Sequence, residues 1–500
     1  MQYGFLIDHD RCIGCHACTV ACKSENDVAV GNFRTWVKYT ERGTFPTVKR
    51  TFAVLRCNQC TNAPCVTICP VTALSKRKDG IVDLDRDACI GCRACMQACP
   101  YDALHLDTDT GSVGKCHYCA HRVEQNLAPA CAVVCPTQAI VHGDLHDPAS
   151  AISRQIAAAR TLVRRPEQGT GPNVHYKGVE PLALEPGAPV RLDTYLWSER
   201  PGTKPEPWPV ELATTPDART VLDVGHRVEW GWGVASYLVT KGIGGGAGML
   251  APLVGLMGLT GFARDWLPEL AALLFTGVTT GLLVEDLARP MKFLTLLTRP
   301  NTKSWLVRGA WILIGFTLVA TAILALRWFG FVAAADALRW VEAPLGAAVA
   351  GYTAFLFAQC EGRDLWQSRV VLPHLLLQAL ACGAALFVPF SLIAGLATPI
   401  LPVLPLLGAA LLGHAALALY EWRGPHDTTN AQQGAAFLGT VRVGPLRALP
   451  LSLVVGVVVP LLLLPVVPLW LSALVPLAVY GGLTLYEWAF VRAGQLPPLS

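Results

Sequence analysis

Sixteen of the 18 cysteines lie before residue 136, and this clustering constrains the fold and the chemistry of the chain more than any other feature. In the best-formed groups two residues separate the first three cysteines, so that one tight loop can wrap three thiolates around a metal cluster. The sixteen form four quartets, three of which end in Cys-Pro: Cys12, Cys15, Cys18 and Cys22; Cys57, Cys60, Cys65 and Cys69; Cys89, Cys92, Cys95 and Cys99; and Cys116, Cys119, Cys131 and Cys135.

The quartets favour iron–sulfur clusters over the other uses of cysteine. Thiolates are soft, anionic ligands that suit iron–sulfur chemistry. Structural zinc sites are usually built from two Cys-x-x-Cys pairs and need no third cysteine at the same spacing. Disulfides belong to exported proteins, and the first residues, MQYGFLIDHDRC, show none of the segments typical of an export signal. We therefore expect four [4Fe–4S] clusters that act as a wire for electrons.

Charge divides the chain into two unlike halves. Of the 76 Asp, Glu, Lys and Arg residues, 48 lie within residues 1–225. This split excludes a single soluble globule, and a hydrophobic content of 52% excludes disorder. The net charge of +4 is small and no basic arm is present, so we expect no nucleic-acid partner.

Long apolar segments in the second half predict a membrane domain, since about 20 apolar residues span a bilayer as a helix. We predict eight transmembrane helices, at 232–260, 268–288, 305–327, 341–360, 370–395, 400–421, 447–464 and 469–491. Pro and Gly are dense from Arg164 to Pro216, which favours an extended strap. The expected fold is an α+β, ferredoxin-like four-cluster domain of two bicluster repeats (1–165), a linker strap (166–225) and an all-α membrane anchor (226–500).

The distribution of Lys and Arg predicts the orientation of the chain in the membrane. Eight spans place both ends of the membrane domain on the cluster side, whose loops hold 11 of these residues. The opposite loops hold three, Arg264, Arg327 and Arg339. By the positive-inside rule, we expect a multi-pass protein of the cytoplasmic membrane whose iron–sulfur domain faces the cytoplasm.

The quartet series resembles the four-cluster iron–sulfur subunit of membrane-bound molybdopterin oxidoreductases, such as the dimethyl sulfoxide, polysulfide and tetrathionate reductases. The resemblance covers about residues 1–185 and implies that each fourth cysteine binds the cluster of another quartet. The first quartet then pairs with the fourth, and the second with the third. The implied ligand sets are Cys12, Cys15, Cys18 and Cys135; Cys116, Cys119, Cys131 and Cys22; Cys57, Cys60, Cys65 and Cys99; and Cys89, Cys92, Cys95 and Cys69.

The second half resembles the quinone-interacting membrane anchor of the polysulfide reductase type, the NrfD-like family. The segments that carry this resemblance are WGWGVASYLVTKGIGGGAG, RPNTKSWLVRGAWILIGF and GYTAFLFAQCEGRDLW, at 230–248, 299–316 and 351–366. The chain thus resembles a fusion of two subunits that are usually separate. The family's quinone pocket uses polar residues of helix one and a tyrosine of helix four. Here Tyr237 and Val234 stand in place of a His and an Asn, and Tyr352 matches the tyrosine.

Ionisable residues inside a membrane are costly and are candidates for function. Tyr237 and Lys241 are four residues apart, so they share a helix face near the cluster side. We expect these two residues and Tyr352 to form the quinone pocket, while Glu285 and Asp286 supply protons and one of the two pairs with Lys241. The alternatives are a snorkelling or ion-paired role for Lys241 and an ordinary core role for Tyr352.

Other polar residues of the membrane domain allow two interpretations each. Glu361, Glu421 and Glu487 end even-numbered helices, either as anchors beside arginine or as groups that take up protons. Two of them lie in the repeats LYEWR (419–423) and LYEWA (485–489), which suggest two related helix bundles. His374 and His414 are expected to be buried and hydrogen-bonded, with bis-His ligation of haem as the alternative.

These observations predict an electron-transfer and membrane-anchor subunit. It would pass electrons between a separate catalytic subunit, which carries a molybdenum or tungsten pterin, and menaquinone or ubiquinone in the membrane. The chain itself would carry the quinone site and no site for the primary substrate, for which sulfite, formate and polysulfide remain open. The alternatives are a quinol-oxidising conduit to multihaem cytochromes without a pterin subunit, and a proton-translocating module driven by the wire.

Overall fold

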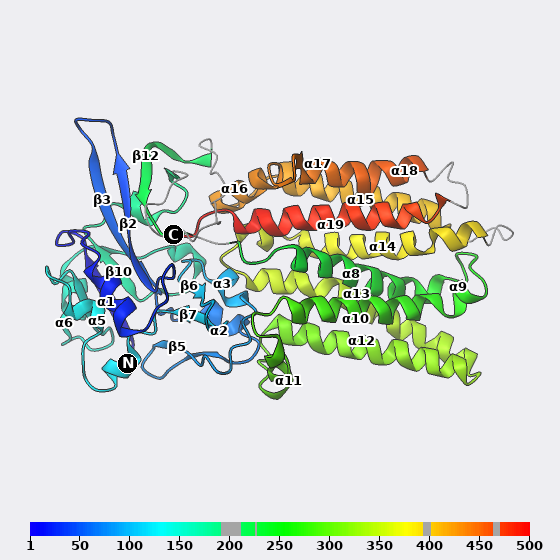
Figure 1. The fold of residues 1–500 in the computed structure, drawn as a ribbon, viewed down its shortest axis with the longest axis horizontal. Helices are drawn as coiled ribbons and strands as arrows, with labels where there is room; N and C mark the ends of the chain where they lie inside the picture. Colours follow the sequence, from blue (N-terminus) through cyan, green and yellow to red (C-terminus); the bar gives the residue numbers. More distant parts are fainter. Residues whose placement is uncertain (192–211, 226–227, 394–401, 464–470) are drawn as a thin grey trace.

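The computed structural model describes residues 1–191, 212–225, 228–393, 402–463 and 471–500. A mixed α/β part, here called the cysteine-rich domain, lies at one end of an elongated molecule, and a bundle of long helices, the helical domain, lies at the other (Figure 1). The last residues return to the cysteine-rich domain, where the Leu499 carbonyl accepts a 2.7 Å hydrogen bond from Arg164. Parts of the expected strap and of the spans at 370–395, 400–421, 447–464 and 469–491 fall outside the described residues.

The first sheet of the cysteine-rich domain is built around a buried N-terminal strand. Its order is β8-β1-β10-β9, in which β8 runs antiparallel to β1 and β10 runs parallel to it. Strand β10 falls within the range expected as a linker strap. It joins the sheet because Val174 and Tyr176 are apolar, alternate along the strand and are fully buried. The strands are β1 (Tyr3–Asp8), β8 (Ile140–Asp144), β9 (Thr161–Leu162) and β10 (Val174–Lys177).

The quartets lie on short helices and hairpins beside a second sheet of order β11-β12-β2-β3. Helix α1 packs on α5, and α2 packs on α3, so the first quartet is next to the fourth and the second is next to the third. The strands are β2 (Thr35–Arg42), β3 (Lys49–Arg56), β4 (Leu74–Lys76), β5 (Val82–Leu84), β6 (Leu104–Leu106), β7 (Val113–Lys115), β11 (Pro189–Arg191) and β12 (Thr215–Leu222). The helices are α1 (Ala17–Glu25), α2 (Pro64–Ile68), α3 (Ala94–Ala98), α4 (Ala120–Val123), α5 (Ala130–Val133), α6 (Ala151–Ala158) and α7 (Pro181–Leu184).

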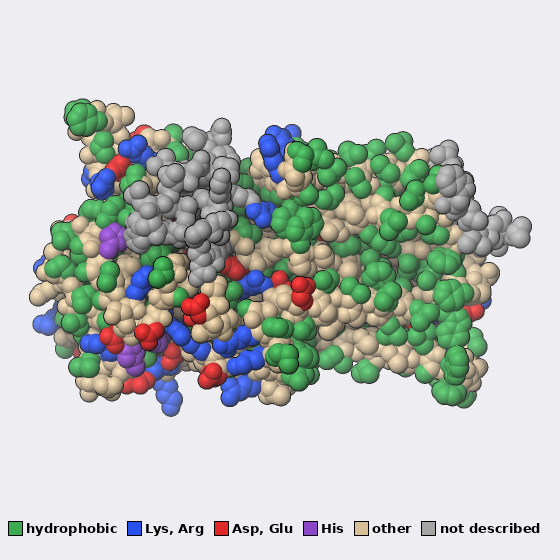
Figure 2. All heavy atoms as spheres, in the orientation of Figure 1, with side chains coloured by type: hydrophobic (Ala, Val, Ile, Leu, Met, Phe, Trp, Pro, Cys, Tyr) green, Lys and Arg blue, Asp and Glu red, His purple; other side chains and the backbone are tan. Residues whose placement is uncertain are grey.

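Within the described ranges, six helices are long and apolar enough to cross a membrane. Their outer surface is largely hydrophobic, whereas charged side chains gather on the cysteine-rich domain and at its junction with the helices (Figure 2). This pattern is typical of a bundle that lies in lipid. The six are α10 (Leu267–Glu285), α12 (Trp305–Trp328), α13 (Val332–Gln359), α14 (Val371–Ile393), α15 (Val403–Arg423) and α19 (Leu474–Gln495).

The first and seventh expected spans differ from these six. Helix α8 (Trp232–Leu250) ends ten residues before its expected end at 260. It is mostly buried among α10, α13, α14 and α19, and its glycines permit close packing, as where a Cβ on Gly246 would lie 1.9 Å from the Ala379 carbonyl oxygen. The segment Ala448–Leu463 is apolar but shorter, and it consists of α17 (Ala448–Leu453), a π-helical turn (Val454–Val458) and α18 (Val459–Leu463).

Shorter elements connect these helices. On the cluster side, α16 (Thr429–Leu438) and a small hairpin precede α17, and α11 (Thr295–Thr298) precedes α12. At the far end of the bundle, meaning the end remote from the cysteine-rich domain, α9 (Phe262–Asp265) lies between α8 and α10 (Figure 1). The hairpin consists of β13 (Arg442–Val443) and β14 (Leu446–Arg447).

Direct contacts hold the second and third quartets against the helical domain. The Asn301 side chain donates a 2.8 Å hydrogen bond to the Cys69 carbonyl, and the Ser304 hydroxyl donates to Ile68 at 2.7 Å. Buried Arg363 donates to the Gln97 side chain at 2.9 Å. The end of the helical bundle therefore lies directly beside two quartets.

Candidate functional site

All four cysteine quartets share an unusual backbone conformation. The residue before the second cysteine has a positive φ in each, at 69° for Gly14, 47° for Gln59, 70° for Gly91 and 60° for Tyr118. Glycine adopts this conformation without strain, whereas Gln59 and Tyr118 store strain of the kind that is typical of functional sites. The repetition of one loop conformation at four places indicates that the four loops enclose groups of the same shape.

The thiols lie close together across quartets. Cys135 interacts electrostatically with Cys12, and Cys99 does so with Cys57, Cys60 and Cys65. The corresponding sets are Cys22 with Cys116, Cys119 and Cys131, and Cys69 with Cys89, Cys92 and Cys95. In three of these sets the last cysteine of one quartet therefore lies close to the first three of another, and in the fourth set Cys135 lies close to Cys12.

A buried positive group near these sulfurs fits an anionic cluster. Arg56 is fully buried, and its Nη1 atom lies 3.2 Å from the Cys131 sulfur. Its Nε and Nη2 atoms have no hydrogen-bond partner within the described residues. Among the same residues, no three His, Cys, Asp or Glu side chains are placed to hold a single metal ion. The fit to a multinuclear cluster thus rests on the shared loops, the proximity of thiols from different quartets and the buried guanidinium.

An elongated apolar cavity of about 400 Å³ lies where the third quartet meets the helical domain. Cys92 and Trp230 line one end, and the Trp230 indole donates a 3.4 Å hydrogen bond to the Cys92 carbonyl. The cavity continues along α12 to Ile314 and Leu318, which are 46% and 64% exposed on the outer face of the bundle. A hydrophobic molecule can therefore reach the third quartet from the lipid.

Three of the expected site residues line this cavity, and two do not. Tyr237, Tyr352 and Asp286 place polar side chains in its mostly apolar wall. Glu285 is exposed at the end of α10 and lies outside the lining. Lys241 is also outside the lining, although it shares a helix with Tyr237.

Asp286 connects the cavity to the cysteine-rich domain. The Arg93 guanidinium, directly after Cys92 in the chain, lies 2.8 Å from the Asp286 carboxylate and also donates to the Asp286 carbonyl. Burial raises the pKa of Asp286 above its ordinary value, and Arg93 opposes this shift. The raised pKa favours the form that carries a proton.

The expected ion pair between Lys241 and Glu285 or Asp286 is wrong. The Lys241 ammonium instead donates 2.7 Å hydrogen bonds to the Ala350 carbonyl and the Thr353 hydroxyl on α13. It also lies 4.9 Å from the ring centroid of Tyr352. Because α8 and α13 pack closely, the long lysine side chain reaches the neighbouring helix, while Asp286 is already paired with Arg93.

The histidines, one of the helix-end acids and a tyrosine form a buried network in the second half of the bundle. His374 lies 3.0 Å from the Glu421 carboxylate and 2.8 Å from His414, and Tyr486 donates to Glu421. The expectation of buried, hydrogen-bonded histidines is confirmed. Two nitrogens in direct contact leave no room for the haem iron of the alternative. Glu421 and Glu487 are both 1% exposed, so they do not lie at the membrane surface as anchors.

Sequence reasoning missed Trp230, Arg93 and the wall of the cavity formed by α12. Trp230 stands in the quoted segment WGWG, but its contact with Cys92 depends on how the two domains dock. Arg93 falls in a cluster loop, where its position after Cys92 was the only available signal. The apolar residues of α12 carry no pattern that separates a cavity wall from a lipid-facing surface.

Comparison with known protein families agrees with both halves of this geometry. Residues 3–24 match a family described as 4Fe-4S binding domain, and residues 48–145 match one described as 4Fe-4S dicluster domain. Residues 220–495, more than half of the chain, match the family described as Polysulphide reductase, NrfD. The chain belongs to the NrfD family.

The cysteine-rich half of this NrfD protein is similar to iron–sulfur subunits of known reductases. The iron–sulfur subunit of a putative dimethyl sulfoxide reductase from Halobacterium salinarum is 41% identical over 218 residues, which is 38% of this chain and 82% of the relative. A tetrathionate reductase subunit from Salmonella typhimurium is 41% identical over 202 residues, 40% of this chain and 80% of the relative. A polysulfide reductase chain from Wolinella succinogenes is 39% identical over 176 residues, 35% of this chain and 92% of the relative. The expected fusion of an iron–sulfur subunit with an NrfD-type anchor is confirmed.

Proposed function

We propose that this NrfD protein transfers electrons between a catalytic subunit with a molybdenum or tungsten pterin and quinone in the membrane. The observation that carries the proposal is the cavity that Cys92 and Trp230 of the cluster side share with Tyr237 and Tyr352 of the membrane helices. A quinone needs an apolar channel for its tail, polar groups for its head and a redox centre within reach. This cavity supplies the apolar channel and the polar groups, and it lies directly beside the third quartet.

Four [4Fe–4S] clusters would supply one-electron transfer steps when bound. The proposed ligands are the sixteen cysteines in the four exchanged sets, which the proximity of the thiols supports. Buried Arg56 would offset part of the negative charge of the sulfurs near Cys131. The catalytic subunit is proposed to dock at the first quartet, where Cys15, Ile13 and Val20 are exposed.

Residues around the cavity have separate proposed tasks in quinone chemistry. The hydroxyls of Tyr237 and Tyr352 hydrogen-bond the carbonyl oxygens of the head group. Asp286 exchanges protons with the head group, because burial favours its protonated form and Arg93 can stabilise the carboxylate left behind. The apolar residues of α12 hold the tail.

The membrane arrangement is proposed to include two more spans than the six long helices. Helix α8 is shielded from lipid by its neighbours and so tolerates low hydropathy, and the segment 448–463 lies along α19. With these eight spans, the Lys and Arg distribution supports a cluster domain that faces the cytoplasm. That orientation favours the pterin partner over the alternative of multihaem cytochromes, which mature outside the cytoplasm.

Adding quinol to the protein in lipid vesicles tests the proposed function. The expected result is reduction of the clusters, seen as bleaching of their visible absorbance and the appearance of reduced-cluster EPR signals. A protein with intact clusters that quinol leaves oxidised, and whose reduced clusters do not reduce added quinone, would contradict the proposal.

The exchanged ligand sets make a prediction for Cys99→Ser. Because Cys99 lies among Cys57, Cys60 and Cys65, this substitution is expected to damage the cluster of the second quartet and to leave that of Cys89, Cys92 and Cys95 intact. The wild type is expected to contain about 16 iron and 16 acid-labile sulfur atoms per chain. Iron analysis and EPR of the variant, with Cys382→Ser as the control thiol, check this. Loss of the third quartet's cluster instead would refute the exchange.

Lys241 is proposed as a positioning residue that acts through Tyr352. Its bonds to Ala350 and Thr353 hold the stretch of α13 from which Tyr352 points into the cavity. Lys241→Met is expected to reduce quinone turnover by about 10-fold, which corresponds to about 1.4 kcal/mol. Reduction of the clusters by dithionite should be unchanged. Steady-state kinetics with Lys241→Arg, which keeps a donor, should show partial recovery, and normal turnover by the methionine variant would refute this role.

A further inference from the structure

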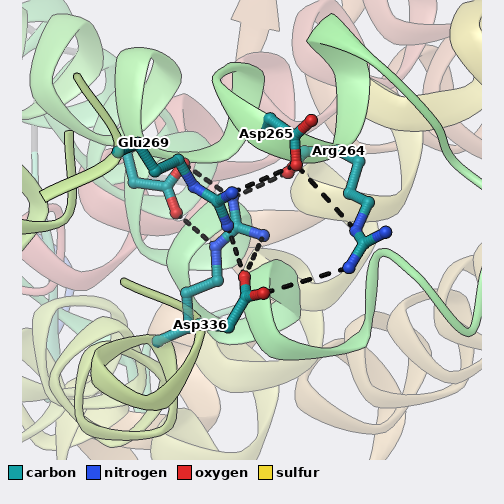
Figure 3. Close-up of polar contacts among 6 residues, drawn as sticks. Arg264, Asp265, Glu269 and Asp336 are labelled. Atoms are coloured by element: carbon teal, nitrogen blue, oxygen red, sulfur yellow. Dashed lines mark hydrogen bonds and ion pairs between the residues drawn. The ribbon is translucent and has the colours of Figure 1, made fainter. Parts of the chain in front are cut away.

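Six charged side chains gather at the far end of the helical domain, remote from the quartets and from the quinone cavity. Figure 3 shows that they come from α9, α10, the end of α12 and α13 and point toward one another. Arg339 donates to both carboxylate oxygens of Glu269, at 2.6 and 2.9 Å, and both side chains are buried. The six are Arg264, Asp265, Glu269, Arg327, Asp336 and Arg339.

The charges of this cluster already balance, with three arginines against three carboxylates. Arg327 pairs with Asp265 at 3.1 Å and also with Asp336. Asp265 and Asp336 are 37% and 39% exposed, so they bring the cluster into contact with water at the far surface. Arg339 and Glu269 form its buried inner end.

Glu342 lies beside this inner end, but the cluster offers it no unmatched positive charge. It follows Arg339 by three residues on α13, so it lies one helical turn deeper. It is 0% exposed, and neither carboxylate oxygen has a hydrogen-bond partner among the described residues. Burying an unpaired carboxylate is very costly, and the nearby Arg339 is already matched by Glu269. The neutral, protonated acid is therefore the form that this environment favours.

The side chains around Glu342 leave one direction in which it can exchange a proton, toward the Arg339–Glu269 pair. The charged groups that face it are Glu269 from α10 and Arg339 from α13. Helix α8 faces it with Gly248, whose added Cβ would lie 3.4 Å from the Glu342 side chain. Toward the quinone cavity, α8 and α13 meet backbone to backbone, since a Cβ on Gly245 would lie 2.7 Å from the Gly346 carbonyl oxygen. This contact separates Glu342 from Lys241.

We propose that Glu342 is a proton-binding site that exchanges protons with the water at the far face through the Arg339–Glu269 pair. In the exchange step, the proton of Glu342 moves to the Glu269 carboxylate, and the Arg339 guanidinium shifts from Glu269 to the newly charged Glu342. The O–H bond broken at Glu342 is replaced by one at Glu269, and the total charge of the three groups stays the same. Glu269 then releases the proton to water that reaches Asp265 and Asp336.

Infrared spectroscopy of the full chain in lipid vesicles tests this site without any quinone reaction. Each buried protonated carboxyl gives a C=O stretching band that shifts in D2O, and Glu342→Gln is expected to remove one such band, that of Glu342. The control Asp427→Asn changes an exposed acid on the cluster-side loop after α15 and should leave the band unchanged. Other partly buried acids such as Asp286 contribute bands of their own, so a Glu342→Gln spectrum that keeps every D2O-sensitive carboxyl band of the wild type would overturn the proposal.

Two further measurements keep the test decisive if Glu342→Gln fails to fold. In wild-type vesicles, changing the pH or introducing D2O only on the far side is expected to alter the band, whereas the same change on the cluster side should not. In Glu269→Gln, far-side exchange of the band is expected to slow by about 100-fold, because the proton acceptor is lost. Exchange from the cluster side alone, or displacement of the proton by sodium, would contradict the proposed proton site.

Discussion

Quinol oxidation by the Cys92→Ala protein is expected to fall to the background rate. Cys92 is the proposed cluster ligand that lies in the cavity wall, and Trp230 contacts its carbonyl. Loss of this one cluster would remove the redox centre nearest to the quinone while the others remain. Iron analysis should give about 12 atoms per chain instead of about 16.

The Cys92→Ala experiment needs a control for loss of a thiol and one for loss of fold. Cys382→Ala removes a buried thiol of α14 that lies outside the four quartets, and it should keep full iron content and turnover. EPR should still detect the remaining clusters of Cys92→Ala after reduction by dithionite. Normal quinol oxidation by a Cys92→Ala protein that has lost one cluster would show that electrons reach quinone from another quartet.

Ala310→Phe is expected to weaken quinone binding by about 10-fold or more, the size of effect that steric misfit in an apolar pocket produces. Ala310 lies on α12 in the wall of the cavity of about 400 Å³, where a phenyl ring would take the space of the quinone tail. The apparent KM for quinol should rise while the iron content stays unchanged. Titration of turnover against quinol concentration measures the effect.

Ala322→Phe is the matched control for Ala310→Phe. It adds the same ring to the same helix, at a residue exposed on the outside of the bundle. Lipid can accommodate the ring there, so kinetics close to those of the wild type are expected. Equal kinetics for the two variants would place the quinone site elsewhere.

Much of the cysteine-rich half could be predicted because the spacing of its cysteines is typical of one kind of metal-binding loop. The 2-2-3 spacing around Cys89 determines a loop, and the positive φ at Gly91 shows that loop in place. The strap was harder to predict. Pro and Gly in RRPEQGTGPN suggested an extended linker, yet Val174 and Tyr176 immediately afterwards complete a sheet with β1, a pairing that depends on residues about 170 positions away.

In the membrane half, hydropathy predicted the long helices better than the contacts between them. The expected start of α12 agrees with the structure, whereas the helix expected at 341–360 begins at Val332, because the polar residues Asp336, Arg339 and Glu342 interrupt the apolar pattern. These residues are buried or paired with other charged residues at the far end of the bundle, and a hydropathy profile contains no information about such contacts. The glycines of α8 likewise lower its hydropathy although it lies at the centre of the bundle.

The sequence predicted which helices carry the residues of the candidate site and how deep these residues lie. It did not predict which side chains they contact. Tyr237 and Tyr352 line the same cavity, since they lie near the cluster side of α8 and α13. The partner of Lys241 could not be predicted, because side-chain pairing depends on how α8 rotates against α10 and α13. The position of Asp286 at the cluster-side end of α10 predicts a role in proton supply, but its pairing with Arg93 follows from the docking of two domains.

Photolabelling with a light-activated quinone analogue tests the central claim most directly. The full chain in lipid vesicles would be illuminated with the analogue, digested, and analysed by mass spectrometry, with excess natural quinone as the competitor. Competable labels are expected on the cavity wall, in peptides that contain residues 283–297, 306–318 or Tyr352. Labels confined to α14, α15 and α19, around His374 and His414, would contradict the claim that quinone meets the clusters beside Cys92.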